Sequence, residues 1–85
     1  MFKIKAADGT NNLCGRQIAA IRKEKKLSQR KLAIKMQLQG FDVDHYFIRR
    51  VENGERFVTD IDLVIFSRAL GVSIVDLFPE NNMQL

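Results

Sequence analysis

The sequence predicts an all-α protein, a compact domain of five helices, because of its apolar spacing, its capping residues and its composition. Apolar residues recur three and four positions apart, which is the spacing of one helix face. Ser28, Asp44, Thr59 and Ser73 each precede such a run, and all four are residue types that cap helix N-termini. The 85 residues include one proline and 46% hydrophobic residues, which is enough for one small core.

The first helix is expected over residues 13–25. Cys14, Ile18 and Ile21 share one stripe, and Arg22 lies about 40° from that stripe at 100° per residue. Because Cys14 is the only cysteine and falls on the apolar stripe, we expect a buried, reduced thiol rather than a redox sensor.

The helical domain is expected to cover residues 13–78. Residues 1–12 then form an N-terminal arm, and residues 79–85 form a C-terminal tail. Within the arm, residues 2–5 alternate in polarity like a strand, but a lone short strand could pair only with a second subunit.

Ser28 predicts the N-cap of a second helix that runs to about Gln39 and breaks at Gly40. Its core stripe consists of Leu32, Ala33 and Met36. We expect the apolar loop 41–43 to fold over the two apolar residues on the other side of this helix, Ile34 and Leu38.

Asp44 predicts the N-cap of a third helix, which packs through Phe47, Ile48 and Val51 and ends at Gly54. The opposite face carries polar, aromatic and basic side chains: His45, Tyr46, Arg49 and Arg50. Arginine can donate two parallel hydrogen bonds to guanine, and tyrosine and histidine can bond base edges or phosphate. This face is therefore suited to contact with DNA bases.

Two further helices follow. Thr59-x-x-Asp62 opens a fourth helix that runs to Leu70 and is closed by Gly71, and Ser73-x-x-Asp76 opens a short fifth helix that ends before Pro79. On the fourth helix, Ile61 and Ile65 are expected to point away from the core, beside Phe57. These three apolar residues are a candidate dimer interface.

Charge is unevenly distributed along the chain. Residues 1–56 hold 13 basic and 6 acidic side chains, a charge of +7, whereas residues 57–85 hold 1 and 4, a charge of −3. A positive N-terminal two thirds suits a polyanion as partner.

Several classes of function are disfavoured. No apolar run is long enough to span a membrane, and the N-terminus has no signal-peptide pattern, so we expect a cytoplasmic protein without a membrane partner. One histidine and one cysteine cannot supply a metal site with the usual spacing, and no catalytic triad or glycine-rich phosphate loop is present. We therefore expect no enzyme activity, no metal and no cofactor.

A set of short motifs extends from about Leu13 to Phe78. Its members are Ile18, Ile21-Arg22, Leu27-Ser28-Gln29, Leu32-Ala33, Ile48, Val51-Glu52-Asn53-Gly54, Ala69-Leu70-Gly71-Val72-Ser73 and Asp76-Leu77-Phe78. Together they resemble the helix-turn-helix proteins of the phage-repressor and Cro type, the xenobiotic-response-element (XRE) family. The resemblance implies a lambda-repressor-like domain of five helices whose third helix lies in the major groove. It also implies a homodimer on a roughly palindromic operator, acting as a transcriptional regulator and most simply as a repressor.

The resemblance assigns roles to individual residues. His45, Tyr46 and Arg50 occupy positions that read bases, and Arg49 is a further candidate for base reading. The family positions that contact phosphate are occupied by Gln29, Asn53 and Arg56. Arg30 and Lys31 are further candidates for phosphate contact, because they make this edge of the second helix positive. Arg22 and Glu52 match an ion pair that ties the first helix to the third.

The chain departs from the family pattern in three places. Ala33 and Ile48 lie 15 positions apart, about five more than a helix-turn-helix with a short turn needs. Lys31 stands where a capping box would place glutamate or glutamine. Arg49 stands where relatives commonly carry a small hydroxyl residue, so the base preference cannot be borrowed.

A second class of function remains open. The chain could be an antitoxin or a phage regulatory protein that acts mainly through protein-protein interaction, with its apolar Ile61 and Ile65 surface holding a protein partner. Fold alone does not separate this alternative from DNA binding.

Overall fold

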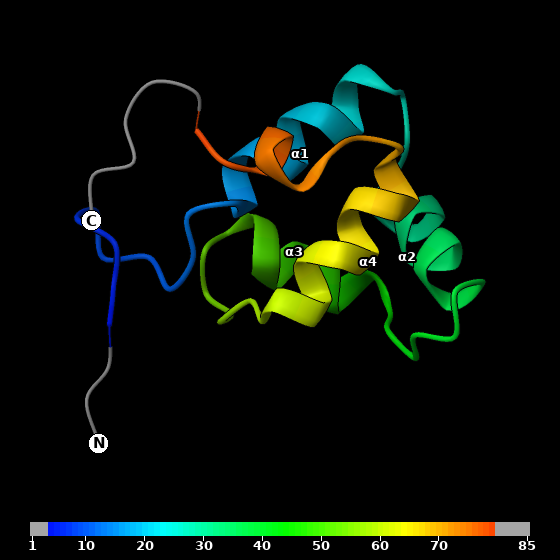
Figure 1. Ribbon diagram of the computed structural model, residues 1–85. Helices are drawn as coiled ribbons and strands as arrows, with labels where there is room; N and C mark the ends of the chain where they lie inside the picture. Colours follow the sequence, from blue (N-terminus) through cyan, green and yellow to red (C-terminus); the bar gives the residue numbers. More distant parts are fainter. Residues whose placement is uncertain (1–3, 80–85) are drawn as a thin grey trace.

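The computed structural model describes residues 4–79, which form four α-helices and one 3-10 helix around a single core (Figure 1). The elements are α1 (Gly15–Glu24), α2 (Gln29–Gln37), α3 (His45–Glu52), α4 (Asp60–Leu70) and the 3-10 helix η1 (Ile74–Leu77). The all-α class is confirmed for these residues. The predicted fifth helix is present only as a single 3-10 turn, residues 74–77, and not as an α-helix. The strand-like residues 2–5 lie largely outside the described part.

Ser28, Asp44, Thr59 and Ser73 each precede a helix, as predicted. At the first three, the side chain of the capping residue accepts a hydrogen bond from a backbone N–H of the helix. The Ser28 hydroxyl accepts a hydrogen bond from the Lys31 N–H at 3.0 Å, and the Asp44 carboxylate accepts one from the Phe47 N–H at 3.0 Å. Thr59 and Asp62 form a reciprocal capping box at the start of α4. Such bonds satisfy N–H groups that the helix itself leaves unpaired, so they fix where α2, α3 and α4 begin.

The start of α1 depends on Asn12 instead. The helix begins at Gly15 rather than at Leu13, and the Asn12 side-chain oxygen accepts a hydrogen bond from the Gly15 N–H at 2.8 Å. A Cβ on Gly15 would lie 2.1 Å from the Val51 carbonyl oxygen. Only glycine allows α1 to approach α3 this closely.

The end of α1 uses a residue in the left-handed conformation. Lys26 has a φ of 57°, and the Leu27 N–H donates to the Arg22 carbonyl at 3.0 Å. This is the Schellman arrangement, in which glycine is the usual residue. The lysine therefore carries backbone strain at this position.

The core lies between all the elements, with α3 against α1 and α2, and α4 against α2, α1 and η1. Its fully covered side chains include Ile18, Leu32, Met36, Ile48, Val51, Phe66 and Leu77. Cys14 is also buried, as expected. Burial raises the pKa of the Cys14 thiol to about 11 because the thiolate would be poorly solvated there.

The connection between α2 and α3 differs from the expectation. α2 ends at Gln37, Gly40 has a φ of 90°, and the loop packs Phe41 and Val43 against the main core. It does not cover the apolar residues on the outer side of α2, because Leu38 remains 83% exposed and Ile34 53% exposed. Two hydrogen bonds hold the loop against the core instead. The Gln37 side chain donates to the Val43 carbonyl at 2.7 Å, and the Phe41 N–H donates to the Met36 carbonyl at 3.2 Å.

The apolar face proposed for α4 also needs correction. Ile61 is 61% exposed and Phe57 is 51% exposed, but Ile65 is partly buried against the core. Its carbonyl accepts a hydrogen bond from the Gln39 side chain at 3.3 Å. The Ile65 side chain is therefore partly covered by the core, and of the three residues only Phe57 and Ile61 are exposed.

Residues assigned to the N-terminal arm contact the domain. The Asn11 N–H donates to the Gly54 carbonyl at 2.8 Å, and the Asn12 side-chain amide donates to the carbonyls of Val51 at 3.1 Å and Arg56 at 2.8 Å. These bonds fasten residues 11–12 to the segment that follows α3. No helix among residues 4–79 has the length and apolar character needed to cross a bilayer.

Candidate nucleic-acid interface

The outer face of α3 carries the four residues predicted to read bases. Ile48 and Val51 are completely buried and hold the opposite face against the core. Tyr46 is 55% exposed, Arg49 and Arg50 are exposed, and His45 is partly exposed. The packing of α3 therefore places this polar, basic face toward solvent.

Three of these side chains touch one another. The His45 and Tyr46 rings lie with centroids 4.2 Å apart at an angle of 33°, and the Arg49 guanidinium carbon lies 5.6 Å from the Tyr46 ring centroid. The phenol ring is thus flanked by an imidazole and a guanidinium. Contacts of this kind contribute about 0.5–1 kcal/mol at exposed sites and restrict the rotamers that Tyr46 can adopt. Arg50 stands apart from the cluster.

Arg22, Glu52 and Gln29 form a network that fixes α3 relative to α1 and α2. The Arg22 Nε and Nη2 atoms donate to the two Glu52 carboxylate oxygens at 2.6 and 3.0 Å. Arg22 Nη1 donates to the Leu27 carbonyl at 2.8 Å. The side chains of the pair are only 10% and 7% exposed, so the pair is shielded from solvent screening.

Gln29, named as a phosphate contact, is part of this network. Its side-chain amide donates to Glu52 Oε1 at 3.0 Å. One of its two amide hydrogens is used in this bond, and the other remains available as a donor. Gln29 therefore joins the first turn of α2 to the last turn of α3, which the sequence reasoning did not foresee.

Arg56 is held by an aromatic ring rather than by an acid. Its guanidinium carbon lies 4.7 Å from the Phe47 ring centroid, and Phe47 in turn stacks on Phe66 with centroids 5.9 Å apart. The loop cation is therefore anchored to the core through two rings.

The remaining cations and amides named for phosphate contact lie on two neighbouring helix ends. Arg30 and Lys31 are exposed on the first turn of α2, and Asn53 is exposed at the C-cap of α3. The bond between Gln29 and Glu52 brings these two ends together. Gln29 and Asn53 thus lie on two neighbouring helix ends, Arg30 and Lys31 are exposed next to Gln29 along α2, and Arg56 follows on the loop after α3.

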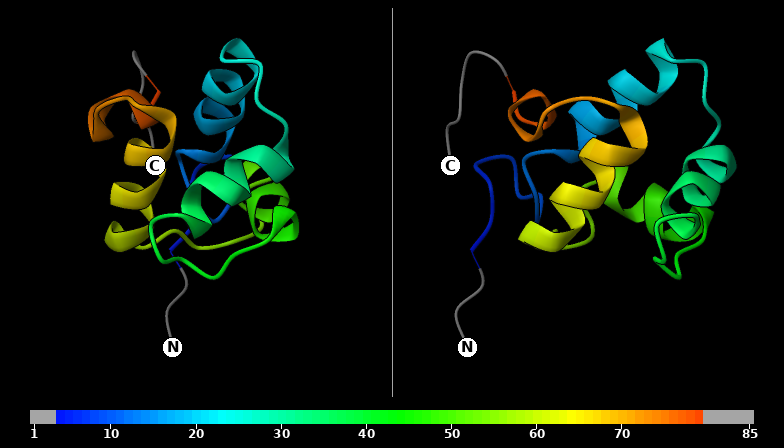
Figure 2. Two further views of the ribbon diagram at one scale, coloured as in Figure 1. Left: turned by 90° about the vertical axis from the view of Figure 1, so that its right-hand side faces the viewer. Right: turned by 45° about the vertical axis from the view of Figure 1, so that its right-hand side comes forward.

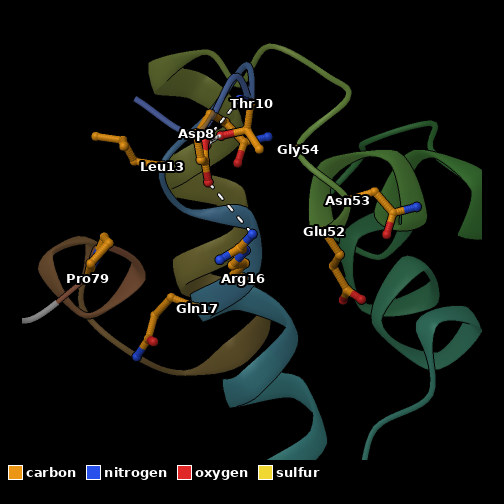
Figure 3. A pocket seen from close by; sticks show the side chains of 10 residues that line it. Asp8, Thr10, Leu13, Arg16, Gln17, Glu52, Asn53, Gly54 and Pro79 are labelled. Carbon is orange, nitrogen blue, oxygen red and sulfur yellow. Dashed lines mark hydrogen bonds and ion pairs between the residues drawn. The ribbon is translucent and has the colours of Figure 1, made fainter. Parts of the chain in front are cut away.

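A hollow of about 320 Å³ lies between the N-terminal segment, α1 and the end of α3 (Figure 3). Asp8 and Arg16 form an ion pair of 3.7 Å at its edge. Hydrogen bonds from the Thr10 hydroxyl and N–H lower the pKa of the Asp8 carboxyl below its ordinary value. These contacts organise the segment before α1. The described range 4–79 contains no group of three or more histidine, cysteine or acidic side chains that could hold a metal.

Two solved structures share this fold. The restriction-modification controller protein C.AhdI from Aeromonas hydrophila matches with a TM-score of 0.67 and 28% sequence identity, over 75% of this chain and 86% of that chain. The clp gene regulator ClgR from C. glutamicum matches with a TM-score of 0.69 and 24% identity, over 79% of this chain and 80% of that chain. No protein-family model and no curated protein matches the sequence.

These similarities support the resemblance found in the sequence: the chain has the fold of these two regulators and resembles the XRE-type helix-turn-helix proteins. The two similar proteins are a restriction-modification controller protein and a gene regulator.

Proposed function

We propose that the chain is a sequence-specific double-stranded DNA-binding regulator that inserts α3 into the major groove. The observation that carries this proposal is the solvent-facing surface of α3, on which exposed Tyr46, Arg49 and Arg50 lie opposite the buried Ile48 and Val51. The similarity to two regulators supports it. A helix with such a face can present donors to base edges while its apolar face stays in the domain.

In this proposal two groups of residues have different tasks. Gln29, Arg30, Lys31, Asn53 and Arg56 contact phosphates and set the orientation of the domain, without selecting sequence. His45, Tyr46, Arg49 and Arg50 discriminate bases. The Arg22–Glu52–Gln29 network keeps the two groups in register, because it links the first turn of α2 to the end of α3.

Arg50 is the strongest candidate for a direct base contact. It is exposed on α3, and it forms no salt bridge and no side-chain hydrogen bond within residues 4–79. Its guanidinium is therefore free to bond both acceptor atoms of a guanine. Arg49 already lies over Tyr46, so a base contact from Arg49 would compete with that interaction.

The functional unit in this proposal is a homodimer on a roughly palindromic operator, at which the protein represses transcription by blocking polymerase. The exposed pair Phe57 and Ile61 is the proposed dimer contact. It supplies an apolar surface, but one smaller than the three-residue patch predicted from the sequence, because Ile65 packs inward.

Selection of bound duplexes from a random pool, followed by titration at several salt concentrations, tests the proposal. We expect a recovered motif with two inverted halves and an affinity that falls steeply with salt, since several phosphates are neutralised. Recovery of no motif, together with binding that does not depend on salt, would contradict DNA recognition. A single unrepeated half-site would contradict the homodimer alone.

A further inference from the structure

Two apolar side chains on α2 are left in solvent by the fold. Leu38 is 83% exposed and Ile34 is 53% exposed. They lie four positions apart, so they form one ridge along the helix. At about 100° per residue this ridge lies opposite the stripe that enters the core, which consists of Leu32, Ala33 and Met36. The core needs neither Ile34 nor Leu38.

Hydrogen bonds on both sides of α2 prevent the chain from covering this ridge. On the side of α3, the Gln37 side chain holds the Val43 carbonyl at 2.7 Å. On the side of α4, the Gln39 side chain donates to the Ile65 carbonyl at 3.3 Å. The loop is thereby fixed beside α2 rather than over it, and the left view of Figure 2 looks onto this outer side of the helix.

The ridge borders a hollow between α2 and α4. The hollow has a volume of about 530 Å³ and is lined by Lys35, Leu38, Gln39, Arg68 and Ala69. Two apolar residues, Leu38 and Ala69, and two cations, Lys35 from α2 and Arg68 from α4, therefore line the same hollow. A volume of this size can receive apolar side chains from a partner segment.

The charge around the hollow is positive and unopposed. Within residues 4–79, neither Lys35 nor Arg68 forms a salt bridge, and α2 contains no acidic residue. A partner that brought its own cations would be repelled here, whereas carboxylates flanking an apolar ridge would meet Lys35 and Arg68.

We propose that Ile34, Lys35, Leu38 and Arg68, the Leu38 surface, dock an acidic amphipathic helix of another protein. The partner places apolar residues, spaced three and four positions apart, against Leu38 and Ile34, and flanks them with aspartate or glutamate. The ridge lies opposite the core stripe of α2, the hollow beside Leu38 is shared with α4, and none of these four residues is among those proposed to contact DNA. The inference therefore goes beyond DNA binding and does not rest on it.

A pair of synthetic helical peptides tests the proposal. Both carry leucines at successive positions i, i+3, i+4 and i+7, flanked by glutamate in one peptide and by lysine in the other. Binding to the full chain is measured by fluorescence anisotropy. We expect the glutamate peptide to bind, the lysine peptide to bind at least about tenfold more weakly, and Leu38→Glu to reduce binding of the glutamate peptide by at least about tenfold.

Matched variants make the result specific. Val75→Glu places the same charge at another apolar position that is 79% exposed, and it should leave peptide affinity unchanged. Leu38→Gln removes the apolar contact without adding charge, and Arg68→Ala removes one cation; both should weaken binding. Circular dichroism checks that each variant stays folded.

Three results would overturn the inference: no binding of the glutamate peptide, equal binding by the wild type and Leu38→Glu, or preference for the lysine peptide. Sedimentation equilibrium provides a fourth, since a wild-type dimer that Leu38→Glu dissociates would assign the surface to a second copy of the chain. Titration of random duplex DNA with Leu38→Glu should show unchanged affinity, which separates this inference from the proposed DNA function.

Discussion

At the scale of single residues, the charged side chains near α3 differ in their surroundings: some are buried in a network, and others are exposed to solvent. Arg22 and Glu52 belong to the first kind, with side chains at most one tenth exposed. Arg50 belongs to the second. Substitutions should therefore separate into those that change stability and those that change recognition.

Loss of Glu52 should be strongly destabilising. Glu52→Ala leaves the Arg22 guanidinium buried with only the Leu27 carbonyl as partner, and an unpaired buried charge typically costs about 3–5 kcal/mol. Urea denaturation should show this loss in the free energy of unfolding. Glu55→Ala, which removes an exposed carboxylate, should change it by less than about 0.5 kcal/mol. Equal effects of the two substitutions would show that the network has no special role.

Cys14 should make stability depend on pH in the alkaline range. Its pKa is raised from 9.0 to about 11 by burial, so the folded state keeps its thiol proton at a pH where the unfolded state has lost it. The resulting stabilisation is complete below about pH 9 and is lost as the pH rises toward 11, by at most about 1.4 kcal/mol per pH unit.

Comparison with Cys14→Ala isolates this effect, because the two proteins differ only in the thiol. The wild type should lose stability more steeply than the variant between pH 9 and pH 11, even though the variant is less stable at pH 7 through its lost packing. Parallel curves would contradict a buried, protonated thiol.

At the scale of elements, local signals predicted the helices well and tertiary contacts less well. Ser28, Asp44 and Thr59 mark three helix starts because each cap bond spans only three residues. The Arg22–Glu52 pair could also be placed, since both residues lie at the edge of an apolar stripe. The end of α2 could not be predicted, because the Gln37 and Gln39 side chains bond to backbone carbonyls that only tertiary packing brings near.

The candidate site shows the same division. Exposure of the α3 face followed from helix periodicity alone. The bond from Gln29 to Glu52 and those from Asn11 and Asn12 to the segment after α3 join residues 23 to 44 positions apart. Asn11 and Asn12 belong to the segment that the sequence predicted only as an N-terminal arm. The fifth helix is only a 3-10 turn, because just four residues lie between its N-cap Ser73 and its C-cap Phe78, which Pro79 follows.

The end of α1 provides a prediction at this scale. Lys26→Gly should raise the free energy of unfolding by about 0.5–1 kcal/mol, because the left-handed conformation at φ 57° costs a lysine more than it costs glycine. Lys25→Gly is the matched control, since Lys25 has a φ of −84° and gains nothing from glycine. It should be neutral or destabilising. Thermal denaturation of the two variants measures the difference, and a stabilised Lys25→Gly or a destabilised Lys26→Gly would contradict the strain.

At the scale of the whole molecule, the fold provides two surfaces of different chemistry. The α3 face combines aromatic rings with cations, as expected for contact with bases and phosphates. The Leu38 surface combines an apolar ridge with cations and suits an acidic helix. We propose that one molecule uses both surfaces, because the residues assigned to one are not among those assigned to the other.

The central claim is that the outer face of α3 reads bases, and Arg50→Ala tests it most directly. Affinity is measured for the duplex recovered by selection and for a random duplex of equal length at one salt concentration. Arg68→Ala, which removes an exposed cation from α4, is the control. We expect Arg50→Ala to lose about 1–3 kcal/mol on the selected duplex and much less on the random one, with relaxed preference at one base pair. An equal loss on both duplexes, or no loss on either, would contradict a base-reading role for α3.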